Sequence, residues 1–504
     1  MKPADPLPHP ASFRDPSGFV FRMNGQYYRQ VNRSYATDYD LLMNSGLYAA
    51  LTGLGLLIPH EEVEDVRAEA DGWYKTLLPQ QIGRISYAWE WSPGQLRDAA
   101  LLTLTILETA IVHGMILKDA TPSNIQFVDG IPVFIDSLSF ERYDETKPWV
   151  AYRQFCECFL FPLYLQRYLR AGIGKLLAAF PEGIPAVVTA KLLPWKSRWN
   201  AGAWLHVTMQ KRIRGNGGSA GGDGRLAFSK KKLGHLTEHL KNIISGFRTD
   251  DRNRSAWGDY YGKTILSADY LEAKEKLFLG FIDGITFGSA LDLGANNGHF
   301  SRLLALKRAE VVAADSDWQC IEELYQSVRK REAGKTGGRD SNAVGRLSKT
   351  GAAGSAGAVR RSETGGRSGG RQLFQNILPL CVDISDPTPA AGFRNAERSS
   401  FTERMQTDLV VALALVHHLV LSKNIPLAGV ARYFAELASQ HLIIEFVPLS
   451  DEKAQELVRN KSRWHTPYDA ESFERFFTLY FSIGRKESVP GTERILYLMT
   501  KNRG

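Results

Sequence analysis

The 504-residue sequence has few cysteines and no long apolar run. Its four cysteines are Cys156, Cys158, Cys320 and Cys381, and only the first two are close, with no second pair to complete a zinc site. No stretch of about 18 apolar residues occurs, and the proline-rich N-terminus lacks the basic-then-apolar layout of a signal peptide. These absences predict reduced structural thiols, no metal centre, no membrane span and a soluble, cytoplasmic protein.

Acidic residues are fewer than basic ones, but the difference lies in one segment. The chain has 62 Lys and Arg against 54 Asp and Glu, a net charge of +8. Between Arg329 and Arg371 there are eleven basic and three acidic residues, which accounts for the whole excess. The Gly- and Ser-rich composition predicts a disordered insertion over residues 332–371. The folded remainder is then about neutral, which argues against a nucleic-acid-binding surface other than this basic loop.

The length predicts two domains, because a single hydrophobic core does not extend over so long a chain. We place them at residues 1–250 and 251–504. The first begins with a hairpin, since Asn24 and Gly25 lie between two β-rich runs. One helix stopped by glycines and a second strand pair follow.

A long apolar helix is predicted next in the first domain. It begins at Ser92 and Pro93, which suit the N-cap and first turn. A mostly helical region continues to about residue 250, interrupted by a flexible Gly-rich loop near residues 214–225.

The rhythm changes at Ala290, where fully apolar strands begin to alternate with amphipathic helices. This pattern predicts a parallel sheet covered on both faces. The last two strands are joined by a short Pro-Gly turn, which can only close an antiparallel pair. The expected fold class is therefore α/β, a Rossmann-like doubly wound domain with a final antiparallel hairpin.

A cofactor site is predicted where the first of these strands ends in LDLGANNGHF. Gly294 and Gly298 permit a sharp turn in which the backbone lies against a ligand, and ligands of such sheets bind at the carboxyl ends of the strands. A dinucleotide fingerprint needs Gly-x-Gly-x-x-Gly, whereas this sequence is Asp-x-Gly-x-x-x-Gly. The carboxylate of Asp292 would repel a pyrophosphate and suits a cation such as the α-amino group of S-adenosylmethionine (SAM).

Two more acids lie at the predicted ends of the next two strands. Asp315 can accept both ribose hydroxyls. Asp383 can accept from the adenine amino group, and its distance from Asp315 is ordinary once the insertion is subtracted. Three acids at successive strand ends predict a SAM site with the following binding residues: Asp292, Gly294, Ala295, Asn296, Asn297, Gly298, Asp315, Ser316, Asp383, Ile384, Leu413 and Ala414.

Candidate catalytic residues follow the fourth and fifth strands. His417 and His418 come just after Leu413 and Ala414, which are expected beside the methyl donor. An imidazole suits a general base at neutral pH, although packed or capping histidines are common in such places. Glu445, at the end of the fifth strand, is the next candidate.

The motifs DLGANNGHF, AADSD, VDIS and LALVHHL resemble those of class I SAM-dependent methyltransferases over roughly residues 257–504. Asn296 stands where that family usually has the middle glycine of Gly-x-Gly. The whole chain resembles bacterial methyltransferases related to the rhizobial nodulation protein NoeA. This resemblance implies SAM as cofactor and supplies no acceptor.

The segment GMILKDATPSNIQFVDGIPVFIDS is similar to the catalytic loop of protein kinases and aminoglycoside phosphotransferases. The resemblance implies an α+β kinase-like first domain with Asp119 as base and Asn124 and Asp136 as magnesium ligands. No glycine-rich phosphate loop is present, and Arg29 replaces the expected lysine. We therefore expect a degenerate kinase-like domain that presents or selects a substrate, with an active or nucleotide-binding kinase-like domain and a chance likeness as the alternatives.

The leading hypothesis is a methyltransferase that moves the methyl group of SAM to an oxygen or nitrogen of an unidentified acceptor. A small molecule or glycan is preferred over RNA because the folded surface is near neutral. The alternatives are a kinase-like phosphotransferase with a SAM-sensing C-terminal domain, an RNA methyltransferase and an interaction protein with an inactive cleft. The acceptor and the oligomeric state do not follow from the sequence.

Overall fold

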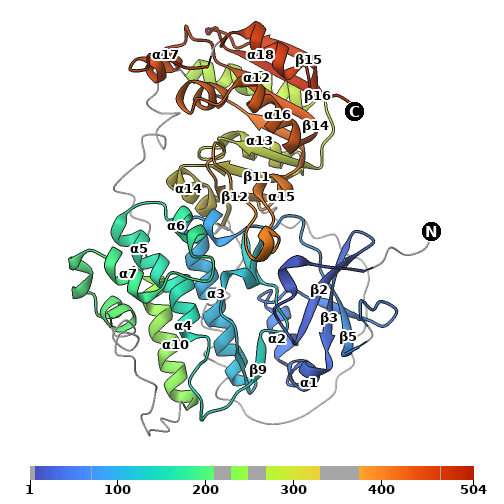
Figure 1. The fold of residues 1–504 in the computed structure, drawn as a ribbon, viewed down its shortest axis with the longest axis vertical. Coiled ribbons are helices and arrows are strands. Elements are labelled where there is room, and N and C mark those ends of the chain that lie inside the picture. Colours follow the sequence, from blue (N-terminus) through green and yellow to red (C-terminus); the bar gives the residue numbers. More distant parts are fainter. Residues whose placement is uncertain are drawn as a thin grey trace, which may run out of the picture.

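The computed structural model describes residues 6–69, 71–208, 229–247, 268–329, 374–465 and 467–503. A helix-covered sheet from the C-terminal half lies above a two-lobed N-terminal half (Figure 1). The predicted insertion 332–371, the Gly-rich loop near 214–225 and the boundary between residues 250 and 251 lie outside the described residues. Within them, no helix is long and apolar enough to span a membrane.

The first lobe is a five-stranded antiparallel sheet with the order β1-β2-β3-β5-β4. The predicted hairpin is confirmed, because Asn24 and Gly25 have φ angles of 50° and 82° and Met23 pairs with Gln26. The predicted second strand pair is β4 with β5. The strands are β1 (Leu7–Pro8), β2 (Gly18–Met23), β3 (Gln26–Asn32), β4 (His60–Val63) and β5 (Trp73–Pro79).

The single helix predicted after β3 is wrong, because the chain forms two helices there. They are α1 (Ala36–Asn44) and α2 (Leu47–Gly53). Gly46 between them has a φ of 81°, a left-handed conformation that ends the helical hydrogen-bond ladder and changes the direction of the chain.

The second lobe is built around the predicted long helix, α3 (Pro93–Val112), and the Ser92 hydroxyl caps it by accepting from the Gln95 N–H. Two strand pairs interrupt the region predicted as mostly helical. They are β6 (Met115–Leu117) with β9 (Phe140–Arg142), and β7 (Ile125–Val128) with β8 (Ile131–Phe134). The helices that follow are α4 (Tyr152–Phe155), α5 (Phe161–Leu169), α6 (Gly174–Ala179), α7 (Ala186–Leu192), α8 (Ala201–Ala203) and α10 (Lys230–Ser245).

The C-terminal half contains a seven-stranded sheet with the order β12-β11-β10-β13-β14-β16-β15. The first five strands in this order are parallel, and β16 pairs antiparallel with both of its neighbours. The predicted parallel sheet with a final antiparallel hairpin is therefore confirmed. The strands are β10 (Ser289–Leu293), β11 (Glu310–Asp315), β12 (Ile377–Cys381), β13 (Thr407–Ala412), β14 (Ala438–Phe446), β15 (Phe481–Ser488) and β16 (Ile495–Lys501).

Helices cover both faces of this sheet because the central strands are apolar on both sides, which buries them completely. Buried residues of β10 belong alternately to two hydrophobic clusters, for example Leu291 to one and Ala290 to the other. The helices are α12 (Ala268–Ile282), α13 (His299–Leu306), α14 (Trp318–Arg329), α15 (Phe401–Arg404), α16 (Leu427–Leu437), α17 (Glu452–Val458) and α18 (Ala470–Phe477).

Single-turn 3-10 and π segments connect these elements. They are η1 (Pro10–Ser12), η2 (Arg33–Tyr35), η3 (Ala88–Glu90), η4 (Pro122–Asn124), η5 (Cys156–Leu160), η6 (Trp195–Trp199), η7 (Trp204–Thr208), η9 (Phe393–Asn395) and η10 (His418–Ser422). The two halves of the chain meet where α14 packs on α3 and where η3 lies beside the edge strand β12.

Candidate cofactor site

The glycine bend after β10 lies against the end of β11. Gly294, Asn296 and Gly298 all have positive φ angles, 75°, 52° and 80°. The N–H groups of Gly294 and Ala295 donate to the Ala314 carbonyl at 2.9 and 3.1 Å, which holds the bend beside the neighbouring strand. The bend therefore lies at a strand switch point, because β11 and β13 flank β10 on opposite sides.

The reason for a glycine at position 298 differs from the one expected. A Cβ atom there would lie 2.5 Å from the side chain of Leu324 in α14. Gly298 thus allows the helices on this face to pack closely, in addition to its positive φ. Gly294 leaves more room, since a Cβ there would meet Leu415 only at 3.6 Å.

Asp315 lies at the end of β11 and reaches the glycine bend. Its two carboxylate oxygens accept the N–H groups of Asn296 and Asp317, each at 2.8 Å. Each oxygen retains lone pairs for further donors such as hydroxyl groups. Burial raises the pKa of this carboxyl, although the backbone hydrogen bonds oppose the shift. The carboxylate is therefore fixed in position with acceptor capacity to spare.

Asp292 is deeply buried, with 2% of the residue exposed. One of its oxygens accepts the Ser301 hydroxyl of α13 at 2.6 Å. Burial raises the pKa of the Asp292 carboxyl to about 6 despite that hydrogen bond. Burial therefore makes its negative charge costly, and a cation beside the carboxyl favours the ionised form.

Asp383 follows β12 and is partly exposed. Its carboxylate accepts the Ser385 N–H and hydroxyl, at 3.0 and 2.6 Å, and pairs with Lys423 at 3.2 Å. Burial opposes ionisation, but the bonds from Ser385 and Lys423 outweigh it and lower the pKa. The Val382 N–H donates to the Asp315 carbonyl at 2.8 Å, so the ends of β11 and β12 are joined.

The structure thus brings the three acids to the carboxyl ends of three adjacent strands, as the sequence predicted. Beside them, Ser316 is exposed and Ile384 is buried, and the Oδ1 atom of Asn297 is buried with no hydrogen-bond partner. A buried oxygen without a partner is unfavourable, so a ligand that donates to it would be stabilised.

The residues after β13 lie on the other side of the bend. Leu413 is 9% exposed, and Ala414 has a φ of 50°, an uncommon backbone conformation for a residue with a Cβ. His417 is buried and its Nδ1 atom has no partner, whereas His418 begins η10 and is half-buried. Burial lowers the pKa of His417 well below its usual value and that of His418 to about 4, so both imidazoles are neutral at pH 7.

Glu445 lies near the carboxyl end of β14 in a buried ion cluster. Its carboxylate accepts from the Lys274 ammonium at 2.6 Å and from the Tyr270 hydroxyl at 2.8 Å, and Arg494 lies 3.8 Å away. Burial disfavours its charge, but Lys274 and Arg494 outweigh burial and lower its pKa. Arg494 also pairs with Asp451 at 2.7 Å. The role of Glu445 as a base stays a prediction.

Sequence reasoning missed this cluster. Lys274 follows Tyr270 by four residues and precedes Phe278 by four, so all three share one face of α12. A lysine on the apolar face of an amphipathic helix is a signal that could have revealed it. Arg494, which is 1% exposed, gave no comparable signal because it follows a turn.

The N-terminal half holds a second group of predicted residues. Asn124 donates to the Ser139 hydroxyl at 3.0 Å, and that hydroxyl donates to Asp136 at 2.9 Å. Burial and the neighbouring Asp136 raise the pKa of Asp119. Arg29 of β3 forms an ion pair with Asp136 at 2.7 Å, so the arginine that replaces the expected lysine contacts the carboxylate predicted to hold magnesium.

No known protein-family profile matches the sequence. The chain is similar over nearly its whole length to nodulation protein NoeA of Rhizobium meliloti (strain 1021), with 26% identity over 500 residues, 97% of this chain and 95% of the relative.

Among solved structures, the chain is similar to magnesium protoporphyrin IX methyltransferase (ChlM) from Synechocystis PCC 6803 with bound S-adenosylhomocysteine (SAH), with 14% identity, 49% of this chain and 93% of that chain covered, and a TM-score of 0.29. It is also similar to the N-methyltransferase NodS from Bradyrhizobium japonicum WM9 in complex with SAH, with 11% identity, 46% and 88% coverage, and a TM-score of 0.29. At this level of similarity the fold assignment rests on the strand order of the sheet itself.

Proposed function

We propose that this protein is a SAM-dependent methyltransferase that acts on an oxygen or nitrogen of a small molecule or glycan. The observation that carries the proposal is the placement of Asp292, Asp315 and Asp383 at the carboxyl ends of three adjacent parallel strands beside a glycine bend. The strand order and the resemblance of the motifs to class I methyltransferases support the same conclusion.

The carboxylate acceptors of the site match the hydrogen-bond donors of SAM one by one. The spare lone pairs of Asp315 suit the ribose hydroxyls, and Asp383, already oriented by Ser385, can accept from the adenine amino group. The buried charge of Asp292 suits the α-amino group, and Leu413 and Ala414 would lie near the sulfonium. SAM supplies an electrophilic methyl carbon, so the protein must chiefly align donor and acceptor and exclude water.

His418 is the proposed base because it is half-buried after β13 and its imidazole is neutral at pH 7. Its pKa of about 4 makes it a weak base, so it suits an acceptor whose proton becomes more acidic as the bond to the methyl carbon forms. A neutral imidazole can take the proton that the acceptor loses, whereas the carboxylate of Glu445 is already engaged by Lys274 and Tyr270. His417, fully buried, would orient its neighbour. Glu445 is the alternative candidate for the base.

The proposal is tested by calorimetry of SAH and SAM with the full chain. We expect saturable one-to-one binding, and the proposal fails if neither compound binds. Mass spectrometry of metabolites and glycans from cells with and without the gene then identifies the acceptor by a missing methyl group. Loss of a methyl mark only on RNA would instead favour the RNA methyltransferase.

The affinity for SAH should depend on pH through Asp292. The folded-state pKa of about 6 lies above the ordinary value of 3.8, so below about pH 6 the free protein holds a proton on Asp292, and this proton must leave before the carboxylate can pair with a bound amino group. Affinity should therefore rise by up to about tenfold per unit between roughly pH 5 and 6 and level off above. Calorimetry over that range checks this, and Asp292→Asn should bind weakly with no such pH dependence. A parallel pH dependence in this variant would contradict the role.

The same raised pKa also affects the stability of the ligand-free fold, which should fall with rising pH while the affinity for SAH rises. Because the folded state keeps its proton to higher pH, this carboxyl stabilises the ligand-free fold most below pH 3.8 and loses that contribution as the pH rises to about 6.

For the N-terminal half we propose a kinase-like domain without phosphotransfer. Arg29 already neutralises Asp136, and a magnesium ion would have to displace it. We therefore expect no thermal stabilisation by ATP with magnesium in the wild type. Stabilisation that is lost in Asp136→Asn would favour the phosphotransferase alternative.

A further inference from the structure

The helix that follows Asp315 is fastened to the N-terminal half by a buried carboxylate. Glu322 of α14, 4% exposed, accepts both the Ser92 hydroxyl and the Gly94 N–H at 2.7 Å. These groups are the N-cap and second residue of α3, so Glu322 completes the cap of a helix in the other half of the chain. Its other oxygen accepts from Gln326 at 2.7 Å, which orients the carboxylate.

Two further contacts hold α14 along its length. The Tyr325 hydroxyl donates to Asp98 of α3 at 2.7 Å. At the start of the helix, three residues after Asp315, Trp318 lies so close to Gly172 that a Cβ there would be 3.0 Å from the indole ring. The N-terminal half therefore contacts α14 both at its start and further along the helix.

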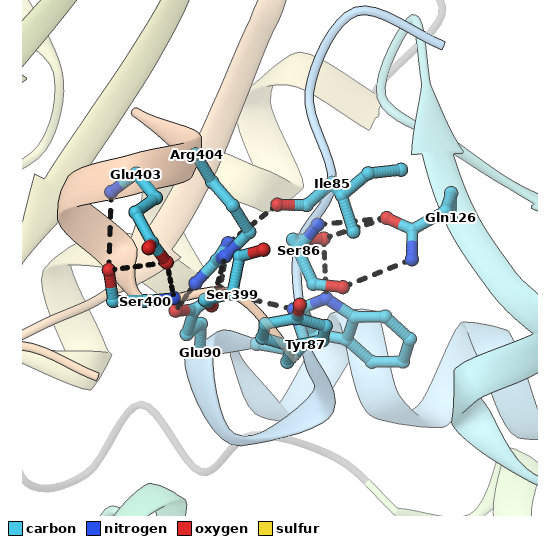
Figure 2. Close-up of polar contacts among 10 residues, drawn as sticks. Ile85, Ser86, Tyr87, Glu90, Gln126, Ser399, Ser400, Glu403 and Arg404 are labelled. Atoms are coloured by element: carbon cyan, nitrogen blue, oxygen red, sulfur yellow. Dashed lines mark hydrogen bonds and ion pairs between the residues drawn. The ribbon is translucent and has the colours of Figure 1, made fainter. Parts of the chain in front are cut away.

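The segment that follows Asp383 is fastened by a second buried charge. Arg404, the last residue of α15, donates to both oxygens of Glu90, at 2.5 and 3.2 Å, and to the Ile85 carbonyl at 2.6 Å (Figure 2). Glu90 is fully buried. The Phe401 N–H donates to the Thr388 carbonyl at 2.9 Å, so the start of α15 is bonded to the segment that follows Asp383.

The same connection continues into the N-terminal half. Ser86, next to Ile85, exchanges hydrogen bonds of 2.9 and 3.1 Å with the side-chain amide of Gln126 (Figure 2). Gln126 lies two residues after Asn124, in the hairpin that follows the kinase-like loop. Continuous polar contacts thus join that hairpin to the segment between Asp383 and Arg404.

These contacts are made by the segments after β11 and β12, which carry the proposed ribose and adenine ligands. The proposed acceptor side has His418, which follows β13, and Glu445, which lies near the carboxyl end of β14. We infer that the N-terminal half is a cofactor-positioning element, in which Glu322 and Arg404 are positioning residues that hold Asp315 and Asp383 for the nucleoside. This inference rests on the proposed function. It gives the N-terminal half a role in binding the methyl donor SAM, whereas the sequence predicted that this half presents or selects the acceptor substrate.

Calorimetry with SAH on the full chain tests the inference. Glu322→Gln keeps the shape but loses the charge that both donors share, and Arg404→Lys keeps the charge but loses the bidentate geometry. Each variant should weaken SAH binding about fivefold or more, measured well below its melting temperature. 5′-Methylthioadenosine, which lacks the amino-acid part, should lose affinity by the same factor, because only the nucleoside contacts are displaced.

Two controls separate positioning from general destabilisation. Leu47→Ala removes a fully buried side chain of α2, so it should lower the melting temperature without changing SAH affinity. Arg432→Ala breaks an exposed pair with Glu436 within α16 and should change affinity less than about twofold. Unchanged SAH affinity in folded Glu322→Gln and Arg404→Lys would overturn the inference while leaving the methyltransferase proposal intact. Absence of SAH binding by the wild type would instead remove the proposed function itself.

Discussion

Asp315→Ala is expected to weaken SAH binding about a hundredfold, because the two charge-assisted hydrogen bonds that we propose to the ribose, each contributing about 1.5 kcal/mol or more, would be lost together. The carboxylate is held by the Asn296 and Asp317 N–H groups, so it needs no reorganisation to bind. The same variant also removes an acceptor from the glycine bend, which adds to the loss. Calorimetry with SAH measures the effect, and circular dichroism confirms that the variant is folded.

Glu310→Ala is the matched control for this experiment. Glu310 begins the strand that Asp315 ends, so the two carboxylates lie at opposite ends of β11, and Glu310 is exposed. Its removal should leave SAH affinity within about twofold, as is usual for an exposed charge. An equal loss in the two variants would mean that the effect arises from the stability of β11 and not from contact with the nucleoside.

Lys274→Met is expected to produce the largest loss of stability. It leaves Glu445, which is fully buried, without its closest cation, and breaking a buried ion pair in this way costs about 3–5 kcal/mol. Thermal unfolding should show a melting temperature lower by about 10 °C. The loss should shrink near pH 5, because a Glu445 without its cation can then take up a proton and shed the buried charge.

Two further variants test whether that loss of stability comes from the unpaired charge of Glu445. Lys276→Met, two residues along α12 on its exposed side, should leave the melting temperature nearly unchanged. The double variant Lys274→Met/Glu445→Met removes both charges and should recover most of the lost stability. Methylation of the identified acceptor by the recovered double variant would exclude Glu445 as the base, whereas its loss with intact SAH binding would favour Glu445 over His418.

Much of the fold of the C-terminal half could be predicted from local sequence patterns. The apolar strands, the amphipathic helices and the Pro-Gly turn predicted a parallel sheet with a final hairpin, because these features depend on residues close together in the chain. The acids at the strand ends could be predicted for the same reason, because each lies next to the apolar strand that marks its position. Helix α12 and the residues from 385 to 406 were not predicted, since their conformations depend on distant partners such as Glu445 and Glu90.

The sequence by itself determined which residues end each strand, because period and composition mark strand ends and glycine bends. Only the tertiary structure decided how charged side chains are paired. It joined Arg29 to Asp136, Glu322 to the cap of α3 and Arg404 to Glu90, pairs separated by about a hundred to more than three hundred residues. Such pairing depends on how whole elements pack, and no local period encodes it. The proposed role of the N-terminal half in positioning the methyl donor therefore rests on the packing of whole elements.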